Sequence, residues 1–140
     1  MKPTLLDVNV LLALAWPNHQ HHAIAHRWFL KHAHHGWATC GLTEVGFIRL
    51  SSNPAYTPAA VSPPEAADLL GQFVEHKAHV FWSSPPARPR SIFAQSLGHQ
   101  QVTDAYLVEV ARENNGRIAT LDTKLAVHGD SSDRVVLIRA

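Results

Sequence analysis

Short apolar runs alternate along the chain with longer stretches in which apolar residues recur every three or four positions. Such a repeat places apolar side chains on one face of a helix, whereas a short apolar run between turn residues is typical of a buried strand. The patterns predict strands at 4–6, 37–40, 80–82, 118–121 and 135–138, and helices at 7–15, 21–34, 42–51, 63–76, 90–97 and 103–114. Strands that alternate with helices predict a central, mostly parallel sheet of about five short strands with helices on both faces, the three-layer α/β/α class.

Residues typical of helix ends support several of these boundaries. Ser62-Pro63-Pro64-Glu65 forms a capping-box sequence with proline just inside the helix. Thr43 and Thr103 stand where helix N-caps are expected, and Gly36 and Gly116 stand where helices should end.

Size and charge narrow the class of protein. The 140 residues suit a single domain over 1–140, and 12 Lys and Arg against 11 Asp and Glu give a net charge of +1. That balance excludes a strongly basic surface, so contact with nucleic acid would depend on local patches. The single cysteine, Cys40, excludes an intrachain disulfide, suits a reducing compartment and is expected to pack as a small apolar side chain.

The first apolar run, "LLDVNVLLALAW", loosely imitates a secretory signal, but Asp7 and Asn9 interrupt it and it contains the first predicted strand. No other stretch approaches the roughly 20 apolar residues of a transmembrane helix. We therefore expect a cytoplasmic protein without a membrane segment.

Four acidic residues follow predicted strands or open predicted helices, namely Asp7, Glu44, Asp104 and Asp122. In α/β folds, ligands gather at the carboxyl ends of the strands. Asp7, Glu44 and Asp104 each head the apolar stripe of a helix, because the positions three and four residues further on are apolar. Glu109, by contrast, shares its helix face with Arg112 and Glu113, which is typical of a solvated face.

A single acid at a helix start is explained by capping, and Asp7 alone would be interpreted in that way. With Thr43 and Thr103 as the caps, however, Glu44 and Asp104 have no capping role. Facing carboxylates raise one another's pKa, and a divalent cation relieves that repulsion. Hard Mg²⁺ or Mn²⁺ prefers carboxylate oxygens, and one or two such ions can activate water against a phosphodiester.

The segments that carry these acids are "LLDVNVLLALAW", "LTEVGFIRL", "VTDAYLVEVA" and "IATLDTKL". In this order and at these intervals they resemble PIN-domain ribonucleases, and more narrowly the VapC toxins of bacterial type II toxin–antitoxin pairs, over essentially the whole chain. The resemblance implies Mg²⁺- or Mn²⁺-dependent endonucleolytic cleavage of a structured RNA such as tRNA or rRNA. It also implies a homodimer neutralised by a small VapB-like antitoxin whose C-terminal segment covers the site.

The resemblance also implies a role for each matching residue. The four family acids fall on Asp7, Glu44, Asp104 and Asp122, and accompanying polar positions fall on Asn9 and Thr120. Asp7 and Asp104 would be the principal metal ligands. Glu44 would bind a second metal or help to deprotonate water. Asp122 would complete the site directly or through water, although it can also be explained as the cap of a short turn.

Other side chains offer weaker candidates for RNA contact. The cations near the acids are Arg49, Arg88, Arg90 and Lys124, and ordinary solvated charge explains each of them equally well. Among the tryptophans, Trp28 and Trp82 fit the core pattern, whereas Trp16 and Trp37 stay open as residues that could stack on bases.

Several competing interpretations remain. His22 and His26 have the spacing of a helical metal pair, but a solvated helix face explains them better, and histidine cleavage of RNA without metal is a further alternative. Asn9 stands where a haloacid-dehalogenase-like phosphatase needs a second acid. A receiver domain would need an acidic pair after its first strand and a lysine after its last strand, and Leu6-Asp7 and "VVLIRA" fail both tests. The stronger rival is a non-catalytic PIN-fold module that binds RNA or protein.

Overall fold

The computed structural model describes residues 3–94, 96, 98–125 and 134–140. Its strands are β1 (Thr4–Leu6), β2 (Trp37–Cys40), β3 (His79–Trp82), β4 (Arg117–Thr120) and β5 (Val135–Leu137). They form one sheet in the order β3-β2-β1-β4-β5, and every neighbouring pair is parallel. The predicted parallel sheet is therefore confirmed, with the first strand of the chain at its centre.

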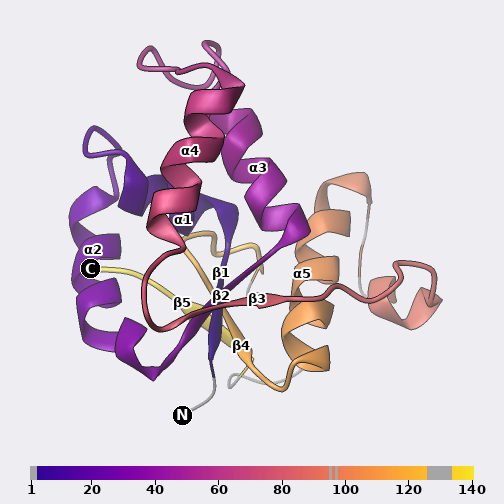
Figure 1. The fold of residues 1–140 in the computed structure, drawn as a ribbon. Helices are drawn as coiled ribbons and strands as arrows, with labels where there is room; N and C mark the ends of the chain where they lie inside the picture. Colours follow the sequence, from indigo (N-terminus) through magenta and orange to yellow (C-terminus); the bar gives the residue numbers. More distant parts are fainter. Residues whose placement is uncertain (1–2, 95, 97, 126–133) are drawn as a thin grey trace.

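Helices cover both faces of this sheet. The α-helices are α1 (Val8–Ala15), α2 (His22–His32), α3 (Gly41–Ser51), α4 (Pro63–Phe73) and α5 (Val102–Glu113), and the short 3₁₀ turns are η1 (Ala33–His35), η2 (Arg90–Phe93) and η3 (His99–Gln101). In Figure 1, α1 and α2 lie on one side of the strands and α5 lies on the other. Together with the sheet they make the three α/β/α layers that the pattern predicts.

The strand alternation divides the core into two clusters. Leu6 packs with α1 to α4 in one cluster, and its neighbour Leu5 packs with α5 in the other. Both side chains are fully buried, because successive residues of a central strand point to opposite faces. Cys40 is also fully buried among apolar side chains, as expected.

Two predicted caps are wrong. The N-cap of α3 is Cys40, and Thr43 lies inside the helix, where its hydroxyl bonds the backbone of Cys40. The N-cap position of α5 is Gln101, without a side-chain capping bond, so Thr103 lies in the first turn. The 3₁₀ turn η3 runs directly into α5, which leaves no extended residue there to act as a side-chain cap.

Other boundaries differ by a few residues. The capping box at Ser62 is confirmed, but α4 ends at Phe73 rather than His76. The predicted helix at 90–97 is the shorter 3₁₀ turn η2. After α5, the left-handed residue is Asn115, with φ 53°, and not Gly116.

Gly116 has a packing role instead. A Cβ atom at this position would lie 2.5 Å from the Trp82 ring and 2.6 Å from the carbonyl oxygen of Pro3. The glycine therefore lets the start of β4 approach β1 and the ring of β3 closely. Across the described residues, no helix is both long and apolar enough to span a membrane.

Candidate active site

Asp7 is a buried carboxylate at the junction of β1 and α1. Its side chain is 7% exposed and lies at the N-cap of α1, where Oδ1 accepts the backbone N–H of Val8 at 2.8 Å. Its Oδ2 accepts the hydroxyl of Thr120 at 2.7 Å. The capping explanation for Asp7 is therefore correct as far as it goes, but it accounts for one carboxylate oxygen only.

Thr120 joins three parts of the predicted site. It is fully buried at the end of β4, and while it donates to Asp7 its hydroxyl oxygen accepts the Asn9 amide at 3.3 Å and the Asp122 backbone N–H at 3.0 Å. Asn9 in turn accepts the backbone N–H of Leu121 at 3.2 Å. The two polar positions thus fix the chain leaving β4 against the first turn of α1.

The three aspartates lie within electrostatic range of one another. The pKa of Asp7 is raised to about 6: burial raises it most, the charges of Asp104 and Asp122 add to the rise, and the hydrogen bonds from Thr120 and Val8 oppose it. Burial, followed by the charge of Asp122, also raises the pKa of Asp104. Asp122 additionally accepts the backbone N–H of Lys124 at 2.9 Å, so the predicted turn cap and the electrostatic contact are both present.

Glu44 has different partners. Its Oε2 accepts the hydroxyl of Thr39, on β2, at 2.7 Å, and the same hydroxyl oxygen lies 2.8 Å from Nε2 of His79, on β3. Because the Thr39 proton points to Glu44, we assign the proton of His79 to Nε2, from which it donates to Thr39. Burial lowers the pKa of His79, while the charge of Glu44 opposes that shift. Glu44 is absent from the charges that raise the pKa of Asp7.

No ion pair to the three aspartates is found among the residues that the structure describes. Within the described ranges, the ion pairs are those of Arg112 with Glu109 and Glu113, and none involves the four predicted acids. The same residues contain no group of three or more His, Cys, Asp or Glu side chains placed to hold a metal. The carboxylate chemistry and the uncompensated charge suit a hard divalent cation, but the side chains would have to draw together around it.

The predicted RNA-contacting cations are spread over the surface. Arg49 is exposed in the last turn of α3, and Lys124 is exposed beside Asp122. Arg88 and Arg90 line one open hollow of about 560 Å³, together with Phe93.

Three of the weaker candidates also have clear positions. Trp37 is fully buried and its indole N–H donates to His76 at 3.2 Å, which excludes it as a base-stacking residue. Trp16 is partly exposed. His22 lies 2.7 Å from the carbonyl oxygen of Ala13 through Nδ1, so one of its ring nitrogens is engaged by the backbone.

Thr39 and His79 were not predicted from the sequence. Thr39 lies near the carboxyl end of β2, as Thr120 does in β4, and a threonine at this place in an apolar strand was the available signal. His79 stands before the apolar run of β3, and no pattern marked it.

The chain is similar in sequence and in fold to several known proteins. No protein-family model matches the chain. Ribonuclease VapC39 of Mycobacterium tuberculosis is 41% identical over 129 residues, which cover 87% of this chain and 90% of that protein. Ribonuclease VapC38 of the same species is 42% identical over 118 residues, covering 84% of each. The crystal structure of PAE2754 from Pyrobaculum aerophilum has a similar fold, with a TM-score of 0.63 at 18% identity over 97% of this chain and 84% of that one.

Proposed function

The chain belongs to the VapC ribonucleases, the toxins of VapBC toxin–antitoxin pairs, and we propose that it cleaves RNA with the help of a divalent cation held at the candidate active site. The ribonuclease activity is the one that the names of its relatives carry. The observation that supports the metal is a set of three aspartates that oppose one another's charge, two of them with a raised pKa, and none of them in an ion pair within the described part of the chain.

Asp7, Asp104 and Asp122 would hold Mg²⁺ or Mn²⁺, and Glu44 would bind a second ion or help to deprotonate water. When bound, such an ion lowers the pKa of water and stabilises negative charge on the phosphate. A bound divalent ion would offset the repulsion among these carboxylates and would stabilise the charge of Asp7, which burial and the neighbouring acids disfavour.

The chain's own residues would hold the carboxylates in position and would accept a proton from water. Thr120 and Asn9 hold Asp7 and the segment before Asp122 in place, so that both carboxylates stay on one edge of the sheet. Glu44 would accept a proton from the attacking water, because its carboxylate accepts the Thr39 hydroxyl on the β2 side and its charge is not among those that raise the pKa of Asp7.

The finer parts of the proposal concern substrate and assembly. We propose a structured RNA such as tRNA or rRNA as substrate, with Arg88 and Arg90 contacting its phosphates, and a VapB-like antitoxin as partner. A homodimer and a cytoplasmic location stay predictions from the family resemblance.

The first test is cleavage by the wild type and by Asp7→Asn, with Asp68→Asn as the matched control, because Asp68 is exposed on α4. A labelled structured RNA is incubated with Mg²⁺ or Mn²⁺, or with EDTA. We expect cleavage by the wild type and by Asp68→Asn with metal, none in EDTA, and a loss of about 10²-fold or more in Asp7→Asn, which removes a charge at the reacting centre.

Two results would contradict the proposal. Cleavage that persists in EDTA would favour histidine acid–base chemistry without metal. Equal cleavage by the wild type and Asp7→Asn would place any activity elsewhere and would favour the non-catalytic module.

A further inference from the structure

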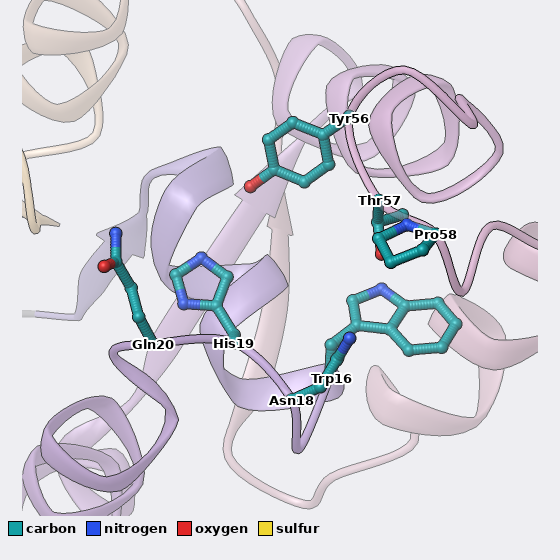
Figure 2. Close-up of a pocket in the computed structure, with 7 residues that line it drawn as sticks. All are labelled: Trp16, Asn18, His19, Gln20, Tyr56, Thr57 and Pro58. Carbon is teal, nitrogen blue, oxygen red and sulfur yellow. The ribbon is translucent and has the colours of Figure 1, made fainter.

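A surface hollow of about 310 Å³ lies between two loops at the far end of α1. One loop follows α1 and the other follows α3, and side chains from both surround the hollow in Figure 2. Its volume is at the lower end of the range that small-ligand sites occupy. It is separate from the acids, because Asp7 caps the start of α1 and Trp16 stands at its end.

Aromatic rings from both loops line the hollow. Figure 2 shows Trp16 and His19 from the first loop and Tyr56 from the second around one space. The indole N–H of Trp16 donates to the fully buried Ser51 hydroxyl at 3.0 Å, which fixes the plane of its ring. Tyr56 is 44% exposed, and its backbone N–H donates to the Asn53 carbonyl at 2.9 Å within a tight turn. The Trp16 ring and the turn that carries Tyr56 are thus held in place by hydrogen bonds within the chain.

The polar groups of the hollow are uncharged. Nδ1 of His19 accepts the backbone N–H of His21 at 3.0 Å, so the ring proton sits on Nε2 as a donor. Burial, followed by the neighbouring histidines, lowers the pKa of His19 and favours the neutral ring. Asn18 and Gln20 add amide donors and acceptors, and among the described residues no Asp, Glu, Lys or Arg lines the space.

We propose that this hollow binds an unpaired nucleobase of the RNA substrate, stacked on Trp16 or Tyr56 with its polar edge toward the amides and the imidazole. The proposal rests on the proposed ribonuclease function. A flat ring with donors and acceptors on its edge matches aromatic faces flanked by neutral polar groups. A phosphate would find no cation there, and an aliphatic peptide side chain would leave the polar groups unpaired.

The distance to the acids fits one RNA strand in contact with both places. The eight residues of α1 span about 12 Å. A strand whose scissile phosphate lies near Asp7 can therefore present a nearby base to the hollow. The hollow would select a nucleotide close to the cut, in a loop or bulge where bases are unpaired.

The test measures RNA binding without cleavage. A short fluorescent single-stranded oligoribonucleotide of mixed sequence is titrated in EDTA with protein carrying Asp7→Asn, and anisotropy gives the dissociation constant. Adding Tyr56→Ala should weaken binding by about tenfold, the effect typical of losing one stacked base. Phe81→Ala is the matched control, because Phe81 is an aromatic residue 58% exposed on β3, away from the hollow, and should leave the affinity unchanged.

A second arm locates the base. One abasic nucleotide is moved through the oligoribonucleotide, and we expect a position at which the missing base weakens binding to the Asp7→Asn protein but not to the protein that also carries Tyr56→Ala. Trp16→Phe, which keeps a ring but loses the bond to Ser51, should show a smaller loss at the same position. Circular dichroism checks that each variant is folded.

Three results would each overturn the proposal. The first is an equal loss of affinity in Tyr56→Ala and Phe81→Ala, and the second is a loss of affinity at the abasic position that does not depend on Tyr56. The third is no binding to the oligoribonucleotide. Failure here is distinguishable from failure of the proposed function, because binding is measured without metal and cleavage is measured with it. Metal-dependent cleavage without any Tyr56 effect would leave the ribonuclease intact and remove the base site. An unchanged RNA affinity would also favour a protein segment as the occupant.

Discussion

Two buried threonines, Thr39 on β2 and Thr120 on β4, flank the central strand and perform the same local task. Each is fully buried, and each donates its hydroxyl to a carboxylate at 2.7 Å. Their surroundings differ. Thr120 holds Asp7 among other acids and accepts two further hydrogen bonds, whereas Thr39 holds Glu44 beside the imidazole of His79.

The difference shows that one hydrogen bond can serve two electrostatic purposes. On the β4 side it holds a carboxylate whose ionisation is disfavoured first by burial and then by neighbouring charges, a position that a cation would stabilise. On the β2 side it holds Glu44, and the same Thr39 hydroxyl oxygen accepts the N–H of His79. Asp7 is therefore held among other acids, whereas Glu44 acts electrostatically on a histidine.

The largest effect we expect is on the pH dependence of stability in EDTA. Asp7 has a pKa of about 6 in the fold against 3.8 as the ordinary value, so the folded state retains the proton longer. Its contribution is fully present below pH 3.8 and is lost as the pH rises through 6, by about 3 kcal/mol in total. Asp7→Asn removes this loss, so its free energy of unfolding relative to the wild type should rise between pH 4 and pH 7 as measured by urea denaturation.

Because the histidines titrate in both proteins, the difference between the two curves is the quantity to compare. Parallel curves for the wild type and Asp7→Asn would mean that Asp7 is ionised at little cost. The surroundings of Asp7 would then disfavour its charge no more than those of Glu44 do, and the comparison would be wrong.

A smaller effect is expected from Thr120→Val. The substitution removes the donor to Asp7 and leaves the Asn9 amide and the Asp122 N–H without their shared acceptor. We expect Mn²⁺ affinity, measured by calorimetry, to fall by about 10- to 100-fold, the loss typical of residues that orient metal ligands. An unchanged affinity would show that the aspartates are positioned without Thr120.

The smallest effect is expected from the matched substitution Thr39→Val. One hydrogen bond to Glu44 is lost, worth about 1 kcal/mol, so cleavage should fall by about 2- to 10-fold. Mn²⁺ affinity should change less than in Thr120→Val, because Thr39 does not contact the three aspartates. A larger loss of affinity in Thr39→Val than in Thr120→Val would reverse the comparison.

Much of this arrangement follows from sequence patterns. The apolar stripes behind Asp7, Glu44 and Asp104 predict their helices, and the strand alternation predicts that the acids meet at one edge of a parallel sheet. Asp7 and Asp122 approach one another because they follow the neighbouring strands β1 and β4, whose carboxyl ends lie at the same edge of the sheet, whereas the position of Asp104 depends on how α5 packs.

The partners of individual side chains were harder to predict. The bonds from Thr39 to Glu44 and from Thr120 to Asp7 depend on which way a side chain turns within its allowed rotamers, and periodicity carries no such information. The failed cap at Thr103 has a similar cause, since a 3₁₀ turn before α5 changed the entry of the backbone. The hollow beside Trp16 is formed by two loops whose positions depend on the packing of α1 against α3.

The hydrogen bond between Asp7 and Thr120 joins residues 113 positions apart in the chain. Contacts of such long range form late, because the loop they close carries a large entropic cost. During synthesis the first acid leaves the ribosome long before β4 can pair with β1, so a nascent chain carries the acid without its site. The hydrogen bond that holds Asp7 therefore cannot form until the chain has been made as far as Thr120, so the candidate site is among the last parts of the described chain to be completed.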